Sequence, residues 1–306
     1  MKLVRYGSNG RERPGLIDPR GALRSLQDVV ADIGPEVYSP AGQRALARLD
    51  VDSLPLVKGK PRLGVPFVGI GKFIAIGLNY HDHARETGAK APSEPIVFNK
   101  WTTCLSGPFD PIEQPPHSTR LDWEVELGVV IGRAARCVGV AQALRHVAGY
   151  CTLNDVSERQ FQLGRGSQWD KGKGCDTFGP VGPWLVTADE VGDPQNLQLT
   201  LSVNGQRMQQ GTTREMIFGV AQIISYLSHF MTLLPGDLIA TGTPAGVGLG
   251  MNPPRFLQPG DVVELEVQGL GVQRQQVVAS RLRVADDARS LVDPAHGGNH
   301  MEALRA

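Results

Sequence analysis

Two glutamates lie two residues apart in the segment 121–131, which reads Leu-Asp-Trp-Glu-Val-Glu-Leu-Gly-Val-Val-Ile. The pattern predicts a β-strand, whose successive side chains point to opposite faces, so Glu124 and Glu126 would face the same side. Two carboxylates directed at one point repel each other unless a cation lies between them. Oxygen ligands favour Mg²⁺, Mn²⁺ or Ca²⁺ over Zn²⁺. The pair therefore predicts a divalent metal site, and the alternative is a solvated strand face with two unrelated acids.

A third acid follows the apolar run that begins at Cys151. Asp155 would lie at the end of a strand, and there it could complete a three-carboxylate site with Glu124 and Glu126. Three acids with water or substrate oxygens make an octahedral sphere of the kind that Mg²⁺ prefers. Alternatively, Asp155 caps a helix that opens at Ser157-Glu-Arg, since Asp is a favoured capping residue.

The segment 79–88 carries a candidate catalytic pair. His83 and Glu86 are three residues apart, so on a helix they share one face. A carboxylate beside an imidazole orients the ring and raises its basicity, which suits a general base that activates water. His81 and Asp82 compete for this role, and an ordinary charged surface helix is the alternative.

Two glycine-rich stretches bear on the same chemistry. Residues 170–180 place Lys171 and Lys173 on an expected flexible loop, where a lysine could bind a carboxylate or stabilise an enolate. Residues 241–248 could bind an anion through backbone N–H groups. This second stretch lacks the Gly-Lys-Ser/Thr of a P-loop and the helix that follows a dinucleotide-binding fingerprint.

The elements that would position these residues are mostly short strands punctuated by 37 glycines and 22 prolines. Strands are expected at 73–79, 121–131, 147–155, 238–242, 261–267 and 273–279, and helices at 23–33, 43–48, 79–88, 141–148 and 216–233. The absence of a regular βαβ rhythm favours an α+β, mainly β fold. We expect a small N-terminal domain at 1–65, a catalytic domain at 66–285 and a C-terminal tail at 286–306.

Composition excludes several classes of protein. The 306 residues contain 31 basic and 31 acidic side chains, and this zero formal charge argues against a nucleic-acid or membrane-surface protein. The N-terminus lacks the apolar run of a signal peptide, and no stretch is apolar enough to span a bilayer. None of the four cysteines forms a Cys-x-x-Cys pair. Reduced cysteines in a cytoplasmic protein are the simplest interpretation.

Seven segments in this order resemble the fumarylacetoacetate hydrolase family, over roughly residues 70–270. They are Ile76-Gly-Leu-Asn-Tyr-His-Asp-His-Ala-Arg-Glu86, Glu94-Pro-Ile-Val-Phe-Asn-Lys100, Trp123-Glu-Val-Glu-Leu-Gly-Val-Val-Ile-Gly132, Asn154-Asp-Val-Ser-Glu-Arg159, Asp176-Thr-Phe-Gly-Pro180, Val203-Asn-Gly205 and Pro235-Gly-Asp-Leu-Ile-Ala-Thr-Gly-Thr-Pro-Ala-Gly-Val-Gly248.

This resemblance implies a mixed β-roll catalytic domain with Mg²⁺ or Mn²⁺, assembled as a homodimer, with pairing of dimers as a further option. The residues that match the family's functional positions fall into three groups. They are the metal ligands Glu124, Glu126 and Asp155; the catalytic residues His83, Glu86 and Lys173; and the substrate-binding residues Arg159, Gln162 and Thr243.

The resemblance is greatest to the sugar-acid branch, which includes hydrolases of 2,4-diketo-3-deoxy-fuconate and -rhamnonate. We therefore expect a metal-dependent hydrolase that cleaves a C–C bond in a 2,4-diketo acid to give pyruvate and a carboxylic acid. The alternatives are an oxaloacetate decarboxylase or tautomerase on the same scaffold, a ureidoglycolate lyase, and a sugar-acid binding protein without turnover.

Overall fold

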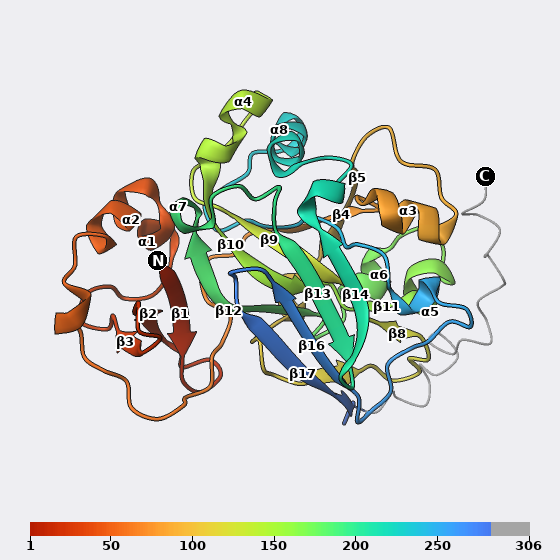
Figure 1. Cartoon of the computed structure of the whole chain (residues 1–306), viewed down its shortest axis with the longest axis horizontal. Coiled ribbons are helices and arrows are strands. Elements are labelled where there is room, and N and C mark those ends of the chain that lie inside the picture. Colours follow the sequence, from red (N-terminus) through yellow and green to blue (C-terminus); the bar gives the residue numbers. More distant parts are fainter. Residues whose placement is uncertain (283–306) are drawn as a thin grey trace.

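Strands dominate the computed structural model, which describes residues 1–282 (Figure 1). The largest sheet has ten strands, of which β6 pairs only with β12. The other nine lie in the order β3, β2, β1, β12, β10, β9, β15, β4, β5. Their bounds are β1 Lys2–Tyr6, β2 Arg13–Ile17, β3 Leu23–Ser25, β4 Phe73–Gly77, β5 Ile96–Lys100, β6 Leu105–Ser106, β9 Val125–Ile131, β10 Val147–Asn154, β12 Gly179–Thr187 and β15 Leu238–Ala240.

A second sheet packs across the first. It has five strands in the order β14, β13, β16, β17, β7, and a short pair, β11 with β8, lies apart from both sheets. The bounds of these strands are β7 Ile112–Gln114, β8 Leu121–Asp122, β11 Ser157–Glu158, β13 Gln198–Val203, β14 Gln206–Thr212, β16 Val262–Val267 and β17 Val272–Ala279.

The helices are short and peripheral. They are α1 Pro35–Tyr38, α2 Pro40–Leu46, α3 His81–Thr87, α4 Val140–Ala143, α5 Arg159–Leu163, α6 Asp170–Lys173, α7 Ala188–Val191 and α8 Val220–Phe230. Within residues 1–282, every helix is too short or too polar to serve as a transmembrane span. The predicted α+β, mainly β class is therefore confirmed.

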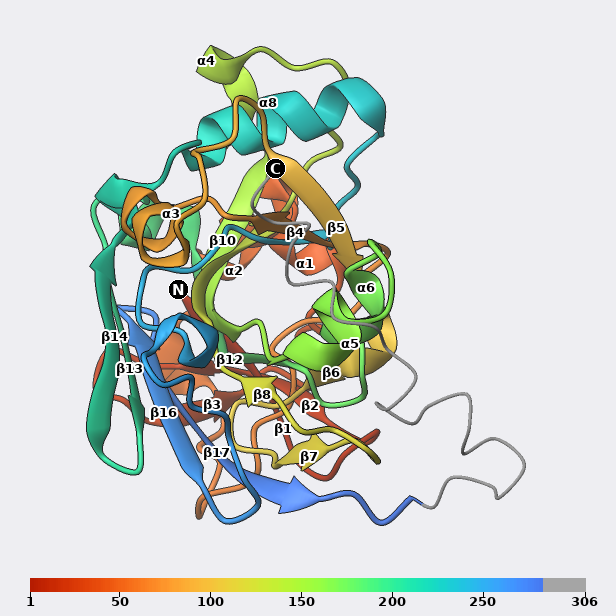
Figure 2. The same cartoon turned by 90° about the vertical axis from the view of Figure 1, so that its right-hand side faces the viewer.

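The core lies where β9 and β10 of the large sheet face β13 and β16 of the second sheet (Figure 2). Leu127, Val129, Leu201 and Val263 come from both sheets and are fully buried. The inward positions of β13 and β16 alternate with polar outward ones, as expected for a sheet with one solvated face. β9 is instead buried on both faces, so Glu126 in the strand and Glu124 directly before it are both buried.

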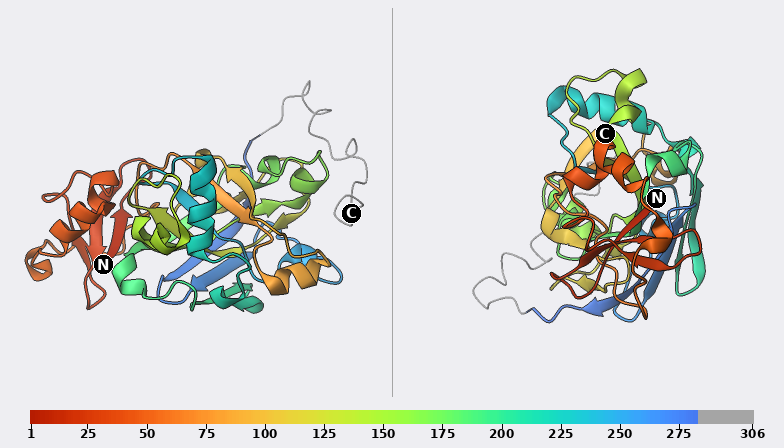
Figure 3. Two further views of the ribbon diagram at one scale, coloured as in Figure 1. Left: turned by 90° about the horizontal axis from the view of Figure 1, so that it is seen from above. Right: turned by 90° about the vertical axis from the view of Figure 1, so that its left-hand side faces the viewer.

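The two ends of the molecule carry different elements. Strands β1–β3 with α1 and α2 lie at one end, whereas α3, α5 and α6 lie at the opposite end (Figure 3). The N-terminal strands continue the large sheet, because β1 pairs with β12 through Leu3 opposite Leu185. The domain boundary at residue 65 stays a prediction, and the tail predicted at 286–306 lies outside the described residues.

Three expected helices differ from the observed elements. Residues 23–33 were expected to be helical, but β3 occupies 23–25 because Arg24 forms an ion pair with Asp18 and its strand pairs with β2. The helix expected at 141–148 is α4 at 140–143, continued by a 3-10 helix at Leu144–His146, and β10 begins at 147. The helix expected at 216–233 is shortened to α8, because Gly219 provides its N-terminal cap and the backbone becomes extended at Met231.

Candidate active site

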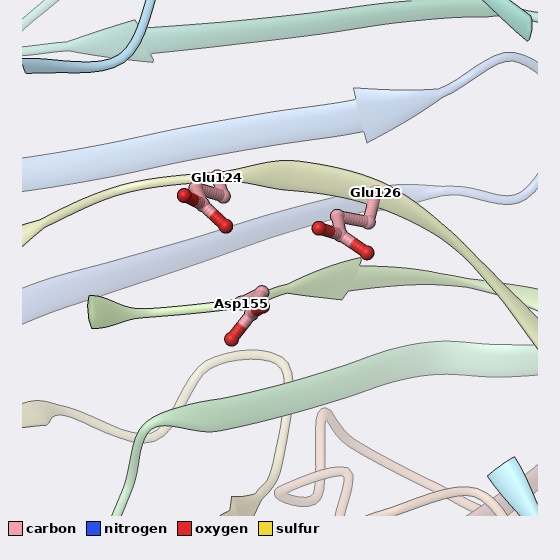
Figure 4. A group of neighbouring side chains, drawn as sticks. All are labelled: Glu124, Glu126 and Asp155. Atoms are coloured by element: carbon pink, nitrogen blue, oxygen red, sulfur yellow. The ribbon is translucent and has the colours of Figure 1, made fainter. Parts of the chain in front are cut away.

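Strand pairing brings the three predicted metal ligands together. Glu124 directly precedes β9, Glu126 is its second residue, and Asp155 directly follows β10. β9 and β10 are antiparallel, and the N–H of Asp155 donates to the carbonyl oxygen of Glu124 at 2.9 Å. One carboxylate oxygen from each of the three acids lies within 4.8 Å of the others, and all three side chains are buried (Figure 4). The helix-cap alternative for Asp155 fails, because Glu158 caps α5.

Three buried cations surround this group of acids. Lys173 Nζ lies 2.6 Å from Glu124 Oε2 and 2.9 Å from Asp155 Oδ2. Arg159 donates to Glu124 Oε1 at 2.6 Å and to Asp122 Oδ2 at 2.8 Å. Lys100 Nζ lies 2.6 Å from Asp155 Oδ1 and forms a buried ion pair with it. Each of these cations therefore fixes an acid that the metal prediction requires.

The charges are not balanced equally over the three acids. Burial alone would raise the pKa of Glu124, but the charges of Lys173 and Arg159 outweigh it and lower the pKa to about 2. Glu126 has no cationic partner among the ion pairs of residues 1–282. Burial, and then the charges of Asp155 and Glu124, raise the pKa of Glu126 well above its usual value. A divalent cation would supply the missing positive charge, so the oxygen donor set fits Mg²⁺ or Mn²⁺.

The glycine-rich loop 241–250 binds carboxylates of the protein itself. The N–H of Gly242 donates to Glu126 Oε2 at 2.8 Å, and the N–H of Gly246 donates to Glu86 Oε1 at 2.8 Å. The next N–H groups, of Gly248 and Leu249, both donate to Asp122. The predicted anion-binding backbone is therefore present, and it orients a proposed metal ligand, a proposed catalytic residue and the partner of Arg159.

The predicted catalytic pair lies on α3. His83 Nδ1 is 3.0 Å from Glu86 Oε2, so the carboxylate sets the orientation of the imidazole. When Nδ1–H donates to the carboxylate, Nε2 is the nitrogen free to accept a proton. α3 ends at Gly88 in the left-handed conformation, and it begins after Asn79, whose amide bonds the backbone of Phe218 and Thr241. These contacts tie the helix to the body of the protein.

A cavity of about 150 Å³ connects the acids to α3. Eight of the nine predicted site residues line it: His83, Glu124, Glu126, Asp155, Arg159, Gln162, Lys173 and Thr243. The ninth, Glu86, contacts the cavity only through His83. His81 is exposed and does not line the cavity. Lys173 was expected on a flexible loop but is buried at the end of α6, because α6 packs against β5 and β11.

Sequence reasoning missed Lys100 and the role of Asp122. Lys100 was part of the family-like segment, and the alternation along β5 does place it on the buried face with Phe98. The Nζ atom of Lys100 also donates to the carbonyl oxygen of Lys173. Asp122 holds Arg159 and accepts three backbone N–H bonds, from Trp123, Gly248 and Leu249. No local pattern indicates these contacts, since their partners lie 37–127 residues away except for Trp123.

Comparison with known proteins agrees with this site. Residues 72–278 match the family model described as fumarylacetoacetate (FAA) hydrolase C-terminal. A protein of Burkholderia multivorans is 56% identical over 282 residues, which cover 92% of this chain and 100% of the relative. The relative carries the provisional name hydrolase, with no substrate.

Solved structures of similar fold cover 92% of this chain and 100% of their own chains. Fumarylacetoacetate hydrolase from Exiguobacterium antarcticum is 36% identical with a TM-score of 0.82. Maleylpyruvate hydrolase from Sphingobium sp. SYK-6, in complex with manganese(II) and pyruvate, is 28% identical with a TM-score of 0.77. A 2-hydroxyhepta-2,4-diene-1,7-dioate isomerase from Mycobacterium marinum is 33% identical with a TM-score of 0.70. The chain thus belongs to the fumarylacetoacetate hydrolase family.

Proposed function

We propose that this protein hydrolyses the C3–C4 bond of 2,4-diketo acids (acylpyruvates) to pyruvate and a carboxylic acid. The observation that carries the proposal is the cavity in which Glu124, Glu126 and Asp155 converge beside the His83–Glu86 pair. The acid group matches a divalent cation, which polarises a chelated keto acid when bound. The manganese and pyruvate in the maleylpyruvate hydrolase structure support the same chemistry.

The residues of this chain then have separate roles. His83, held by Glu86, takes a proton from water, and the resulting hydroxide adds to the C4 carbonyl carbon. The C3–C4 bond breaks, its electron pair moves to C3 and forms the enolate of pyruvate, and a proton then adds to C3. Lys173 donates to the developing enolate oxygen, while Arg159, Gln162 and Thr243 bind the keto acid. Each turnover consumes one water and releases one pyruvate and one carboxylate.

The test is pyruvate release by purified protein with Mg²⁺ or Mn²⁺, measured over several acylpyruvates. A coupled lactate dehydrogenase assay reports pyruvate, and His83→Ala should abolish its release while substrate still binds in calorimetry. Absence of pyruvate from every acylpyruvate with metal present would refute the proposal. Light scattering of the same sample tests the predicted homodimer and any pairing of dimers.

An isomerase or tautomerase is a second candidate, because several structural neighbours, among them the Mycobacterium marinum protein, are named isomerases. Both reactions need an enolate, but only hydrolysis needs a base directed at water. A spectroscopic assay of keto–enol conversion without pyruvate release would favour the isomerase. Release of CO₂ from oxaloacetate and of urea from ureidoglycolate test the decarboxylase and lyase alternatives in the same preparation.

The 2,4-diketo-3-deoxy sugar acid that the sequence resemblance predicts as substrate is one candidate within this proposal. Its distal part carries hydroxyl groups, which need hydrogen-bond partners inside the cavity. The other residues that line the cavity therefore decide whether such hydroxyl groups find partners. The predicted cytoplasmic location and the predicted reduced state of the four cysteines both stay predictions.

A further inference from the structure

We propose that the acyl group accepted by this site is apolar and uncharged, so that the enzyme prefers alkyl or aryl acylpyruvates to sugar-acid or dicarboxylate analogues. The inference rests on the proposed function, because it concerns the part of the substrate beyond C4. It follows from the composition of the cavity wall, from the hydrogen bonds of its polar residues and from the positions of its cations.

Part of the cavity wall is apolar. It is built from the end of β4, from β5, from α5, from the segment before α6 and from the glycine-rich loop. Its side chains are Leu78, Ile96, Phe98, Leu163, Trp169 and Leu249. Phe98 and Trp169 pack edge to face with ring centroids 5.5 Å apart. The Trp169 ring also rests on the backbone of β4, since a Cβ added at Gly77 would lie 2.5 Å from it.

The polar side chains of the lining already have partners in the protein. Thr87 Oγ1 donates to the carbonyl oxygen of His83 at 3.0 Å. Thr243 Oγ1 donates to the carbonyl oxygen of Val125 at 2.9 Å and accepts from Gln209 at 2.8 Å. Gln162 Oε1 accepts from Arg159 at 3.0 Å. Outside the catalytic groups, the Gln162 amide nitrogen is thus the main side-chain donor left, and the proposed function assigns it to the keto acid.

The two cationic side chains that line the cavity also have partners in the protein already. Arg159 and Lys173 both form ion pairs with Glu124, at the end of the cavity where the keto acid would bind. Among the lining residues, all of which are described, no other lysine or arginine is present. A second carboxylate on the acyl group would therefore be buried without a counter-charge, which is strongly unfavourable. No lining residue comes from the N-terminal strands, so this part of the chain adds no polar group to the cavity.

Size sets a further limit on the acyl group. The cavity of about 150 Å³ is similar in size to an apolar cavity that holds one benzene ring, and it has to accept the keto acid as well as the acyl group. This volume favours short acyl groups. Each methylene that replaces water against the apolar wall should raise kcat/KM roughly fourfold.

The decisive experiment compares two isosteric substrates with the wild-type enzyme and Mn²⁺. Isobutyrylpyruvate and lactoylpyruvate differ only by a methyl group in place of a hydroxyl, and lactoylpyruvate is the six-carbon diketo-deoxy sugar acid. We expect kcat/KM for pyruvate release to be at least fivefold higher with isobutyrylpyruvate, because the hydroxyl is buried without a partner. Equal or higher kcat/KM with lactoylpyruvate would overturn the inference and leave the proposed function intact. No pyruvate from either compound, nor from acetylpyruvate, would refute the proposed function and the inference with it.

A variant tests the missing counter-charge. Succinylpyruvate and 4-methylpentanoylpyruvate are matched in shape and differ in the distal carboxylate. Leu163→Arg should improve the succinyl to 4-methylpentanoyl ratio of kcat/KM at least tenfold, because it adds a cation to the apolar wall. Leu144→Arg, which adds the same charge at an exposed position outside the cavity, should leave the ratio unchanged. A wild-type preference for succinylpyruvate would contradict the inference regardless of how the variants fold.

Discussion

Replacement of Glu86 by glutamine isolates the contribution of the carboxylate that orients His83. Its two oxygens have different partners, since Oε2 faces His83 Nδ1 at 3.0 Å and Oε1 accepts from the N–H of Gly246 at 2.8 Å. Both partners are donors, so an amide can satisfy only one of them. The Glu86→Gln side chain is nearly isosteric, and its effect therefore comes from hydrogen bonding and charge.

Two orientations of the amide are available, and each is costly. If the amide nitrogen faces His83, Nδ1 must accept, so the proton moves to Nε2 and the ring cannot take a proton from water. If it faces Gly246, two donors meet, and a buried N–H left without an acceptor costs about 1–3 kcal/mol. Loss of the charged partner removes about 1.5–3 kcal/mol from the imidazolium that forms during turnover. Together with the usual contribution of a general base, these costs predict a fall in kcat of roughly 10²- to 10⁴-fold.

The assay is steady-state pyruvate release, with calorimetry of Mn²⁺ and substrate on the same preparation. KM and metal affinity should change little, because Glu86 contacts neither the acid group nor the cavity directly. Asp82→Asn is the matched control, since it removes an acid from the same helix and keeps an acceptor for the His83 backbone N–H. The reasoning is refuted if Glu86→Gln keeps kcat within threefold of wild type, or if the control falls equally far.

Three further changes test other parts of the site. Gly250→Ala should lower kcat at least tenfold, because the added Cβ would lie 2.5 Å from the carboxyl carbon of Glu86 and would displace that carboxylate from His83. Gly139→Ala is the control and should leave kcat unchanged, because a Cβ there meets no neighbouring atom. Glu126→Gln should stabilise the metal-free protein at pH 8 in thermal unfolding. The raised pKa of Glu126 gives the wild type a stability that is complete below about pH 4.3 and is lost as the pH rises through the folded-state pKa. Added Mn²⁺ should stabilise the wild type but not this variant, and equal stabilisation of both would contradict the assignment of Glu126 as a metal ligand. Lys100→Met should lower the free energy of unfolding by about 1–3 kcal/mol, because Asp155 loses its partner at Oδ1 but keeps the ion pair with Lys173 at Oδ2. A loss below about 1 kcal/mol in urea denaturation would show that Lys100 is dispensable.

Local periodicity was sufficient to predict part of this site. Alternation along 121–131 placed Glu124 and Glu126 on the same side, and helical spacing paired His83 with Glu86. Both predictions depend on a single element, so the geometry of one strand or one helix decides them. The approach of Asp155 was predicted from its place at a strand end, and β9–β10 pairing provides the physical reason.

Contacts between distant segments were beyond the reach of the sequence patterns. Lys100, on β5, reaches Asp155 at the end of β10 although β9, β15 and β4 lie between these two strands in the sheet, and nothing in β5 alone indicates that neighbour. The glycine-rich loop was predicted to bind an anion, but its targets, among them Glu86 and Asp122, depend on how three segments meet. The helix expected at 23–33 shows the opposite failure, since pairing with β2 overrides a helix-like local pattern.

The most direct test of the account measures pyruvate formation from isobutyrylpyruvate by protein stripped of metal with EDTA, before and after Mn²⁺ is added back. We predict no release without metal, full recovery with Mn²⁺ in the wild type, and no recovery in Glu126→Gln. Pyruvate release at the full rate by the stripped enzyme, or full recovery in Glu126→Gln, would contradict the claim that these three carboxylates hold the ion required for C–C bond hydrolysis.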